Sequence, residues 1–335
     1  MKKTSPIVCI LVLILTACAP SAASTAGDPS LQPVASSTPA SSSMTASAPL
    51  ASPSSSPSLF SPATSAAGNP ITAVTQVRSI TIGGIQRSYR LYVPVKVSLN
   101  PTLVIMLHGG GGSAVQAERG YGWDSLADTE GFLVAYPDGE DQSWNAGSCC
   151  ARPAASGVDD VGFITAMVAG LQSEFGVPPQ RTFATGMSAG ALMAYRLACD
   201  TALFAAIAPV AGTIVTPCAS PAPLSVLEIH GTDDQRVRMD GQPGSGGNHV
   251  DGLPVADVIS LFRTADGCGT SSVTTQGTVT TDAASCPGGR RVTLITIDGA
   301  GHQWPGRTGP TIPGADQPSM AINATQVIWD FFNGH

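Results

Sequence analysis

The pattern of polar and hydrophobic positions divides the chain into a long segment without periodicity and a C-terminal part with alternating strand and helix patterns. Ser, Ala, Pro and Thr predominate from Ala19 to about Ala73, and no apolar period runs through them. Such a segment lacks the hydrophobic face that would offset the entropy lost on ordering. We therefore expect a disordered stalk at 19–74 and one folded domain at 75–335.

Apolar runs of strand length recur through the predicted domain. Two of them, Arg78 to Ile82 and Arg87 to Val93, flank a glycine turn and predict a hairpin. The later runs suit strands that are buried on both faces of a parallel sheet. They lie at 102–107, 132–136, 182–184, 205–210, 224–229 and 291–297.

Helical patterns separate these runs. Val161, Ile164, Val168, Leu171 and Phe175 recur at helical spacing and predict an amphipathic helix. Further helices are expected at about 122–129, 189–198, 257–265 and 321–332. Strands that alternate with helices indicate an α/β fold whose central sheet is mostly parallel, with helices on both faces. Ligands of such sheets bind beyond the carboxyl ends of the strands.

The first residues have the pattern of an export signal. Lys2 and Lys3 precede an apolar run at 7–15, and Cys18 follows that run in a lipobox-like Leu-Thr-Ala-Cys. We expect a signal peptide at 1–18, with Cys18 as the lipidated first residue of the mature protein. The alternative is an ordinary signal peptide that is cut nearby. Either predicts an extracellular protein, secreted or held at a bacterial cell surface, with membrane contact only through the lipid anchor.

Charge and cysteine content narrow the class of protein. Charged residues make up 12% of the chain and the net charge is −7, so no basic stripe exists for a nucleic-acid partner. Six cysteines follow the leader, and an even number in an exported domain implies disulfides. Local closure favours Cys199–Cys218 and Cys268–Cys286, which leaves Cys149 and Cys150 as a vicinal pair or two thiols. No CxxC pair with histidine at zinc spacing occurs, so no structural metal is expected.

The candidate nucleophile lies in the segment that reads GMSAG, from Gly186 to Gly190. A Gly-x-Ser-x-Gly sequence between a strand and a helix is typical of a nucleophile elbow. Its sharp turn lifts the Ser188 hydroxyl above the edge of the sheet, and the flanking glycines avoid a steric collision. The alternative is a glycine-rich turn whose serine only caps the following helix.

A serine nucleophile needs a base, and the base needs an orienting acid. Of the five histidines, His302 follows the last predicted strand in a glycine-flanked loop, where it could reach the elbow. Asp233 and Asp234 follow the strand at 224–229, and only one of the two can face the imidazole. The order Ser, Asp, His along the chain is that of α/β-hydrolases.

An oxyanion would need donors that are in place before the reaction. The amide of Ala189, directly after the nucleophile, is the first candidate. The second comes from the glycine run after His108, in which we choose Gly110, with Gly111 next. The run could instead be a flexible loop or a phosphate cradle, but no Lys-Ser/Thr follows it, so a P-loop is rejected.

The motifs LHGGGGS, AYPDG, WNAGSCC, GVDDVGF, GMSAG, APVAG, HGTDD and GHQWPG occur in this order from about Arg78 to the C-terminus. Together they resemble the secreted polyhydroxybutyrate depolymerase and feruloyl esterase group of α/β-hydrolases. The resemblance implies Ser188 as nucleophile and His302 as base, and it selects Asp234 as the acid. It also implies that Trp304 lies near the acyl pocket.

The function expected from these residues is that of an exported serine carboxylic-ester hydrolase that works through an acyl-enzyme without a cofactor or metal. Trp144 and Asn145 are further candidates for substrate binding; their alternative, like that of Trp304, is packing under the loops. The resemblance favours polymer-linked esters of the feruloyl or acetyl xylan type, with polyester depolymerisation as the alternative. A serine peptidase of the same fold and a non-catalytic surface lipoprotein are the other classes considered.

Overall fold

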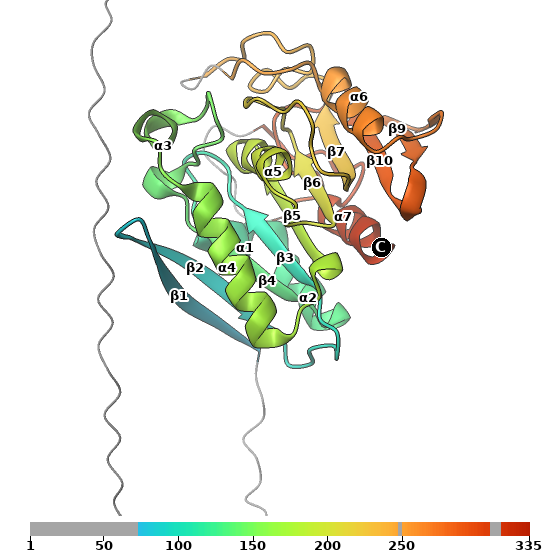
Figure 1. Ribbon diagram of the computed structural model, residues 1–335. Helices are drawn as coiled ribbons and strands as arrows, with labels where there is room; N and C mark the ends of the chain where they lie inside the picture. Colours follow the sequence, from blue (N-terminus) through green and yellow to red (C-terminus); the bar gives the residue numbers. More distant parts are fainter. Residues whose placement is uncertain (1–72, 247–249, 309–315) are drawn as a thin grey trace, which may run out of the picture. The chain divides into compact units, whose positions relative to one another are not determined.

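A computed structural model describes residues 73–246, 250–308 and 316–335. The predicted signal peptide, Cys18 and nearly all of the predicted stalk lie outside the described residues. The described part folds around one ten-stranded sheet in the order β1-β2-β4-β3-β5-β6-β7-β10-β9-β8 (Figure 1). None of the helices in the described ranges has the length and apolar character needed to cross a bilayer.

The strands are β1 (Val74–Ile82), β2 (Ile85–Val93), β3 (Leu103–Leu107), β4 (Leu133–Pro137), β5 (Thr182–Met187), β6 (Ala206–Val210), β7 (Ser225–Gly231), β8 (Ser272–Gln276), β9 (Val279–Ser285) and β10 (Arg291–Ile297). The α-helices are α1 (Ala114–Tyr121), α2 (Trp123–Glu130), α3 (Ala151–Ser156), α4 (Asp160–Phe175), α5 (Ala189–Asp200), α6 (Val255–Ala265) and α7 (Ala324–Asn333). Short 3₁₀ turns occupy η1 (Glu140–Gln142), η2 (Pro179–Arg181) and η3 (Pro287–Gly289).

The centre of the sheet is parallel and its two edges are antiparallel. Strands β4, β3, β5, β6, β7 and β10 pair in parallel. The hairpin β1–β2 joins one side of this block and the hairpin β8–β9 joins the other. This confirms the α/β fold with a mostly parallel sheet. It also means that the carboxyl ends of the six central strands share one edge of the sheet.

Successive side chains along the central strands point to opposite faces of the sheet, and a hydrophobic core lies on each face. Along β3, Leu103, Ile105 and Leu107 pack into one core with α4, α5 and α6. Val104 and Met106 point the other way, into a second core with α1, α2 and α7. Strands that are buried on both faces therefore read as continuous apolar runs.

Two strands and two α-helices were not predicted from the sequence. Strand β8 is exposed along its whole length, and β9 is largely polar, so neither shows the alternation that marks a half-buried strand. Helix α3 has six residues, which is too short for a helical period. Helix α1 follows a glycine run, and only the Ser113 side chain, which accepts a hydrogen bond from the Gln116 amide, marks its start.

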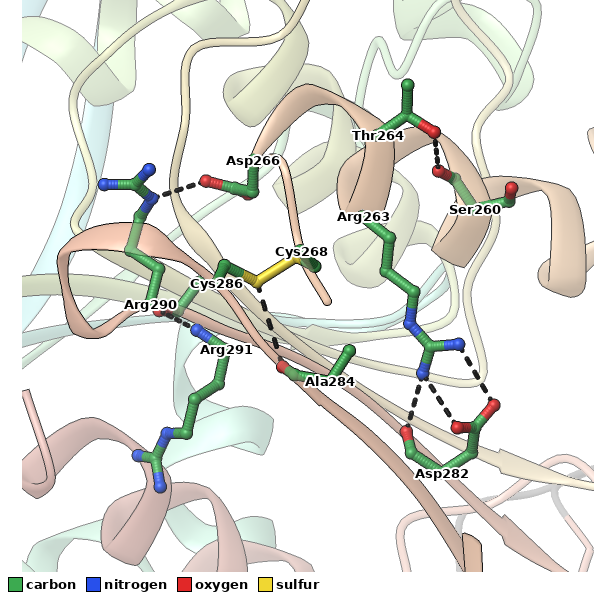
Figure 2. Close-up of a disulfide and its surroundings, with 11 residues drawn as sticks. Ser260, Arg263, Thr264, Asp266, Cys268, Asp282, Ala284, Cys286, Arg290 and Arg291 are labelled. Carbon is green, nitrogen blue, oxygen red and sulfur yellow. Dashed lines mark hydrogen bonds and ion pairs between the residues drawn. A yellow bond between two sulfur atoms is a disulfide. The ribbon is translucent and has the colours of Figure 1, made fainter. Parts of the chain in front are cut away.

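Disulfides join the three cysteine pairs that local closure had favoured or left open. They are Cys149–Cys150, Cys199–Cys218 and Cys268–Cys286. Figure 2 shows the last of these tying the end of α6 to the end of β9. Beside it, Arg263 binds Asp282 and Arg290 binds Asp266. This disulfide thus anchors an edge hairpin that buries little apolar surface of its own.

We expect replacement of both Cys268 and Cys286 by serine to lower the free energy of unfolding by about 3 kcal/mol, because the bond closes a loop in the unfolded chain. The sequence separation of the two cysteines is 18 residues. Urea titration measures the change. The control is Asp282→Asn, which removes a partly exposed ion pair and should cost about 1 kcal/mol or less. Equal losses in both variants would contradict the prediction.

Candidate active site

The four predicted site segments follow the carboxyl ends of β3, β5, β7 and β10. Strand β3 is the direct neighbour of β5, and β7 is the direct neighbour of β10. His108 follows β3, Ser188 follows β5, and Asp234 and His302 lie in the loops after β7 and β10. Because these strands run in parallel, their ends meet at one edge of the sheet.

Ser188 has the strained backbone of an elbow residue. Its φ is 56° and its ψ is −120°, a conformation that non-glycine residues rarely adopt. The Ser188 amide donates to the Val210 carbonyl (3.0 Å), which holds the turn against β6. The hydroxyl makes no capping hydrogen bond to α5. A serine that only caps the helix is therefore not what the structure shows.

The glycines on either side of Ser188 permit a very close approach of backbone segments. A Cβ on Gly190 would overlap the carbonyl oxygens of Leu107 and His108. A Cβ on Gly186 would lie 2.5 Å from the carbonyl carbon of Gly190. The first turn of α5 therefore packs directly on the end of β3, and only glycine fits at both positions.

Asp234 and His302 form a buried pair. His302 Nδ1 donates to Asp234 Oδ2 at 2.7 Å, and both side chains are at most 5% exposed. Asp234 Oδ1 accepts from the amides of Arg236 (2.8 Å) and Val237 (2.9 Å). Burial would raise the pKa of Asp234, but hydrogen bonds from His230 and His302 outweigh it and hold that pKa below its ordinary value. The carboxylate is therefore ionised and oriented towards the imidazole.

The neighbouring carboxylates are placed differently. Asp233 is exposed, and its amide donates to the Ala300 carbonyl (2.9 Å). Asp298 is also exposed, and its carboxylate accepts from the Thr232 hydroxyl at 3.4 Å. Asp234 is thus the carboxylate whose bond to His302 the structure contains.

The loop that carries His302 is held by a carboxylate that the sequence analysis did not single out. Asp316 Oδ2 accepts from the His302 amide at 2.6 Å, and the Asp316 amide donates to the His302 carbonyl at 3.3 Å. A Cβ on Gly301 would overlap the Asp316 carboxylate. The glycine before His302 was therefore the only signal in the sequence for this contact.

The glycine loop after β3 lies against Ser188. A Cβ on Gly109 would be 3.7 Å from Ser188 Cβ. The Gly111 amide donates to the Gln142 carbonyl (2.8 Å) and the Gly112 amide to the Gly109 carbonyl (3.0 Å). In the described part of the chain the Gly110 amide has no hydrogen-bond acceptor. Of the two glycines considered, Gly110 is thus the one whose amide is available as a second oxyanion donor.

His108 and Trp144 pack beside this loop and form hydrogen bonds that hold its start. His108 Nε2 accepts from the Gly139 amide (2.9 Å), so its Nδ1 carries the proton and donates to the Gly109 carbonyl (2.8 Å). Burial lowers the pKa of His108. Trp144 is fully buried, packs on the His108 ring and donates to the His108 carbonyl at 2.8 Å. Both ring nitrogens of His108 thus serve to hold the loop.

Asn145 and Trp304 are also packed inside the protein. Asn145 Nδ2 donates to the Val158 carbonyl (2.9 Å), and the Asn145 amide donates to the buried carboxylate of Asp160 (2.7 Å). Trp304 is 2% exposed and donates to the Thr325 hydroxyl at 3.1 Å. Trp144, Asn145 and Trp304 therefore all have the packing role that the sequence left open as an alternative. Trp144 in particular has no exposed surface that a substrate could contact.

Trp304 differs from the other two because one side of it borders a cavity of about 290 Å³, which Tyr121, Arg307, Asn323 and Gln326 also line. The Tyr121 ring packs on Trp304 at a tilt, and its hydroxyl contacts Met187, the residue before Ser188. Within the described ranges, no group of three or more His, Cys, Asp or Glu side chains could hold a metal ion. The His302–Asp234 pair and the strained turn of Ser188 thus lie at the carboxyl ends of strands of one sheet.

Comparison with known proteins identifies relatives of this chain. The family "Esterase PHB depolymerase" matches residues 87–238. NocK of Nocardia uniformis subsp. tsuyamanensis, a protein assigned as an esterase, is 32% identical over 289 residues, which cover 78% of this chain and 83% of that protein.

Feruloyl esterase B of Piromyces equi is 31% identical, and the acetylxylan esterase of Coprinopsis cinerea is 35% identical. The alignments cover 60% and 44% of this chain, but only 39% and 40% of those two proteins. Among solved structures, an acetyl xylan esterase from Aspergillus awamori has a TM-score of 0.55 at 16% identity, with 78% of this chain and 100% of that chain covered. At that identity the likeness concerns the fold alone.

The close contact at Gly190 yields a prediction about stability. Gly190→Ala should lower the free energy of unfolding by about 3 kcal/mol, because the new methyl group overlaps backbone that cannot move aside. Gly170→Ala in α4 is the matched control, since its Cβ would meet nothing within 4 Å on an exposed helix face. That change should stabilise the protein by about 1 kcal/mol. Thermal unfolding of both variants measures the difference, and a stable Gly190→Ala protein would contradict the packing described.

Proposed function

Since the chain belongs to the esterase PHB depolymerase family and has an α/β-hydrolase fold, we propose that it hydrolyses carboxylic esters with Ser188 as nucleophile, His302 as base and Asp234 as acid. The observation that carries the assignment of residues is the 2.7 Å bond between His302 Nδ1 and Asp234 Oδ2. The two residues lie in the loops after β7 and β10, at the edge of the sheet where β5 ends before the half-buried Ser188.

The geometry supports an acyl-enzyme mechanism. His302 takes the proton of Ser188 as the hydroxyl oxygen attacks the ester carbonyl, and Asp234 stabilises the imidazolium that forms. The imidazolium then protonates the leaving alcohol. A water molecule repeats the sequence on the acyl-enzyme, which releases the acid and restores Ser188. Because Asp234 is held by two backbone amides, the imidazole stays in the tautomer that can accept the proton.

Two backbone amides would bind the developing oxyanion. Ala189 is the first residue of α5, so its amide has no acceptor within the helix and lies at the positive end of the helix dipole. The Gly110 amide is the second donor, in a loop that the Gln142 carbonyl and Trp144 hold in place. Donors held in this way need no reorganisation during the reaction.

For the substrate we propose polymer-linked esters of the feruloyl or acetyl xylan type. The relatives named as feruloyl and acetylxylan esterases support this class. Hydrolysis of a hydroxybutyrate polyester is the second candidate, because the family that matches residues 87–238 is named for it. We further propose that the enzyme is exported and lipid-anchored through Cys18, with 19–74 as a tether. The three disulfides of the domain support an oxidising compartment.

Ser188→Ala should abolish ester hydrolysis while leaving thermal unfolding unchanged, because the hydroxyl supports no capping bond. The stalk-free domain, 75–335, and this variant would be offered methyl ferulate, acetylated xylan and a hydroxybutyrate oligomer in parallel. Preference for the first two would support the hemicellulose proposal, and preference for the oligomer would replace it with the polyester candidate. Full activity of Ser188→Ala would refute the mechanism.

Asp234→Asn should lower kcat by about ten-thousand-fold, because the new amide would donate to His302 Nδ1 and hold the wrong tautomer. Asp233→Asn is the matched control, since that neighbouring side chain is exposed and lacks a bond to His302. It should keep nearly all of the activity. Kinetics on the preferred ester compare the two, and a larger loss in Asp233→Asn would mean that the acid has been misassigned.

A further inference from the structure

A second imidazole contacts the carboxylate of Asp234. His230, near the end of β7, places Nε2 3.4 Å from Asp234 Oδ2, the same oxygen that binds His302. Its side chain is fully buried. The acyl-transfer mechanism described above does not use this histidine. A buried polar group of this kind is costly unless it is fully bonded.

Both ring nitrogens of His230 have partners that accept hydrogen bonds. Nε2 faces the Val237 carbonyl at 2.8 Å, and a carbonyl can only accept. Nδ1 faces Glu228 Oε1 at 2.8 Å. Since both ring nitrogens of His230 donate and one of them faces a buried carboxylate, the ring is a charged imidazolium paired with Glu228. The pair adds a second carboxylate and imidazole behind Asp234 and His302.

Glu228 is itself held on every side. Its carboxylate accepts from the Tyr195 hydroxyl of α5 (2.9 Å) and from the Gly212 amide after β6 (3.1 Å), and it is fully buried. These bonds leave the carboxylate no room to turn away from His230. Burial raises the pKa of Glu228 against the lowering effect of His230.

The charge on His230 follows from its surroundings. Burial lowers its pKa, but the hydrogen bonds and charges of Asp234 and Glu228 outweigh that effect and raise the pKa to about 10. In the described part of the chain, two further ionisable side chains face these residues: the Tyr195 hydroxyl donates to Glu228, and His302 donates to Asp234. The Asp316 carboxylate accepts from the His302 backbone amide, and the Arg236 backbone amide donates to Asp234.

We propose that Glu228 and His230 form a charged positioning pair behind Asp234 that orients the carboxylate and sets the pH range in which His302 can act as a base. This inference rests on the proposed function of the site. His230 is a positioning residue, because it acts on the reaction only through Asp234.

The direction of the pH effect follows from the shared oxygen. An imidazolium on Asp234 Oδ2 partly neutralises the carboxylate and repels a second positive charge on the same oxygen. Without the charge of His230, Asp234 would present its full negative charge to the His302 ring. Loss of the His230 charge should move the acid limb of the kcat/KM profile to higher pH.

The test uses Glu228→Gln and His230→Gln, singly and together. The double variant removes the pair without leaving one buried charge unpartnered. We expect the acid limb to move up by about one pH unit in His230→Gln and in the double variant. That shift corresponds to a roughly tenfold loss at pH values well below the limb. The two changes should not add, since the pair acts as a unit.

Asp266→Asn is the matched control. Asp266 is another fully buried carboxylate in an ion pair, but it binds Arg290 at the C-terminal end of α6 (Figure 2). This variant should lower the melting temperature and leave the acid limb in place. Variants of the pair that lower stability and also leave the limb unchanged would overturn the inference, because a purely structural pair has no other effect.

A measurement on the unmodified enzyme covers the case in which the variants do not fold. Nitrogen NMR of the histidine-labelled protein should show both nitrogens of His230 protonated from pH 5 to pH 8, and a neutral ring would overturn the inference. Ser188→Ala separates this result from the proposed function. If that variant keeps its activity the esterase mechanism fails, whereas an unmoved acid limb with Ser188 essential removes only the role of the pair.

Discussion

The site depends on the close packing of α5 against the end of β3. Gly186 and Gly190 let the backbone of the elbow touch the carbonyl oxygens of Leu107 and His108. No side chain fits between these segments, so the strained backbone of Ser188 cannot relax without separating the helix from the sheet. The same contact brings the glycine loop after β3 against Ser188, so the proposed nucleophile and the proposed oxyanion donors are placed by one packing interaction.

The loops beyond the sheet edge are held by buried polar bonds. Trp144 and His108 bind each other and the glycine loop, while Gln142 accepts the Gly111 amide. On the other side, Asp316 binds the backbone of His302. Buried donors and acceptors of this kind are costly to leave unpaired, which gives each loop one preferred conformation. Ser188 and His302, which follow different strands, are thus each held in a defined position.

Four buried ionisable side chains contact one another in series at and beyond the ends of β7 and β10. Glu228, His230, Asp234 and His302 alternate carboxylate and imidazole, and each is bonded to the next. The alternation gives each buried carboxylate an imidazole N–H as a hydrogen-bond donor, which offsets part of the cost of its desolvation. A more remote pair, Arg87 and Asp160, is buried in the same way below the loop of Asn145. In both of these groups of residues, buried charge therefore lies beside a loop that the charge helps to place.

Local patterns in the sequence were sufficient for the fold class and for most of the candidate site. Strands buried on both faces, such as β3, read as apolar runs, and the glycines around Ser188 marked a turn of a known type. The exposed, threonine-rich hairpin β8–β9 was missed because it contributes no alternating apolar face. Asp233 and Asp234 are adjacent residues of the same type after the same strand, so residue type and spacing could not identify the acid. The choice of Asp234 came from a family resemblance.

The tertiary structure decided what depends on contacts between distant segments. It placed His302 on Asp234, 68 residues away in the chain, and left Asp233 exposed. It paired the Gly111 amide with the Gln142 carbonyl in a hydrogen bond. It also buried Trp144 next to the glycine loop after β3. It also brought His230 onto the oxygen that binds His302. The sequence by itself determined which chemical groups the chain carries to the sheet edge, because periodicity and turn residues are local. Which of those groups bond to each other is a property of burial and distance, and these exist only once the strands are assembled.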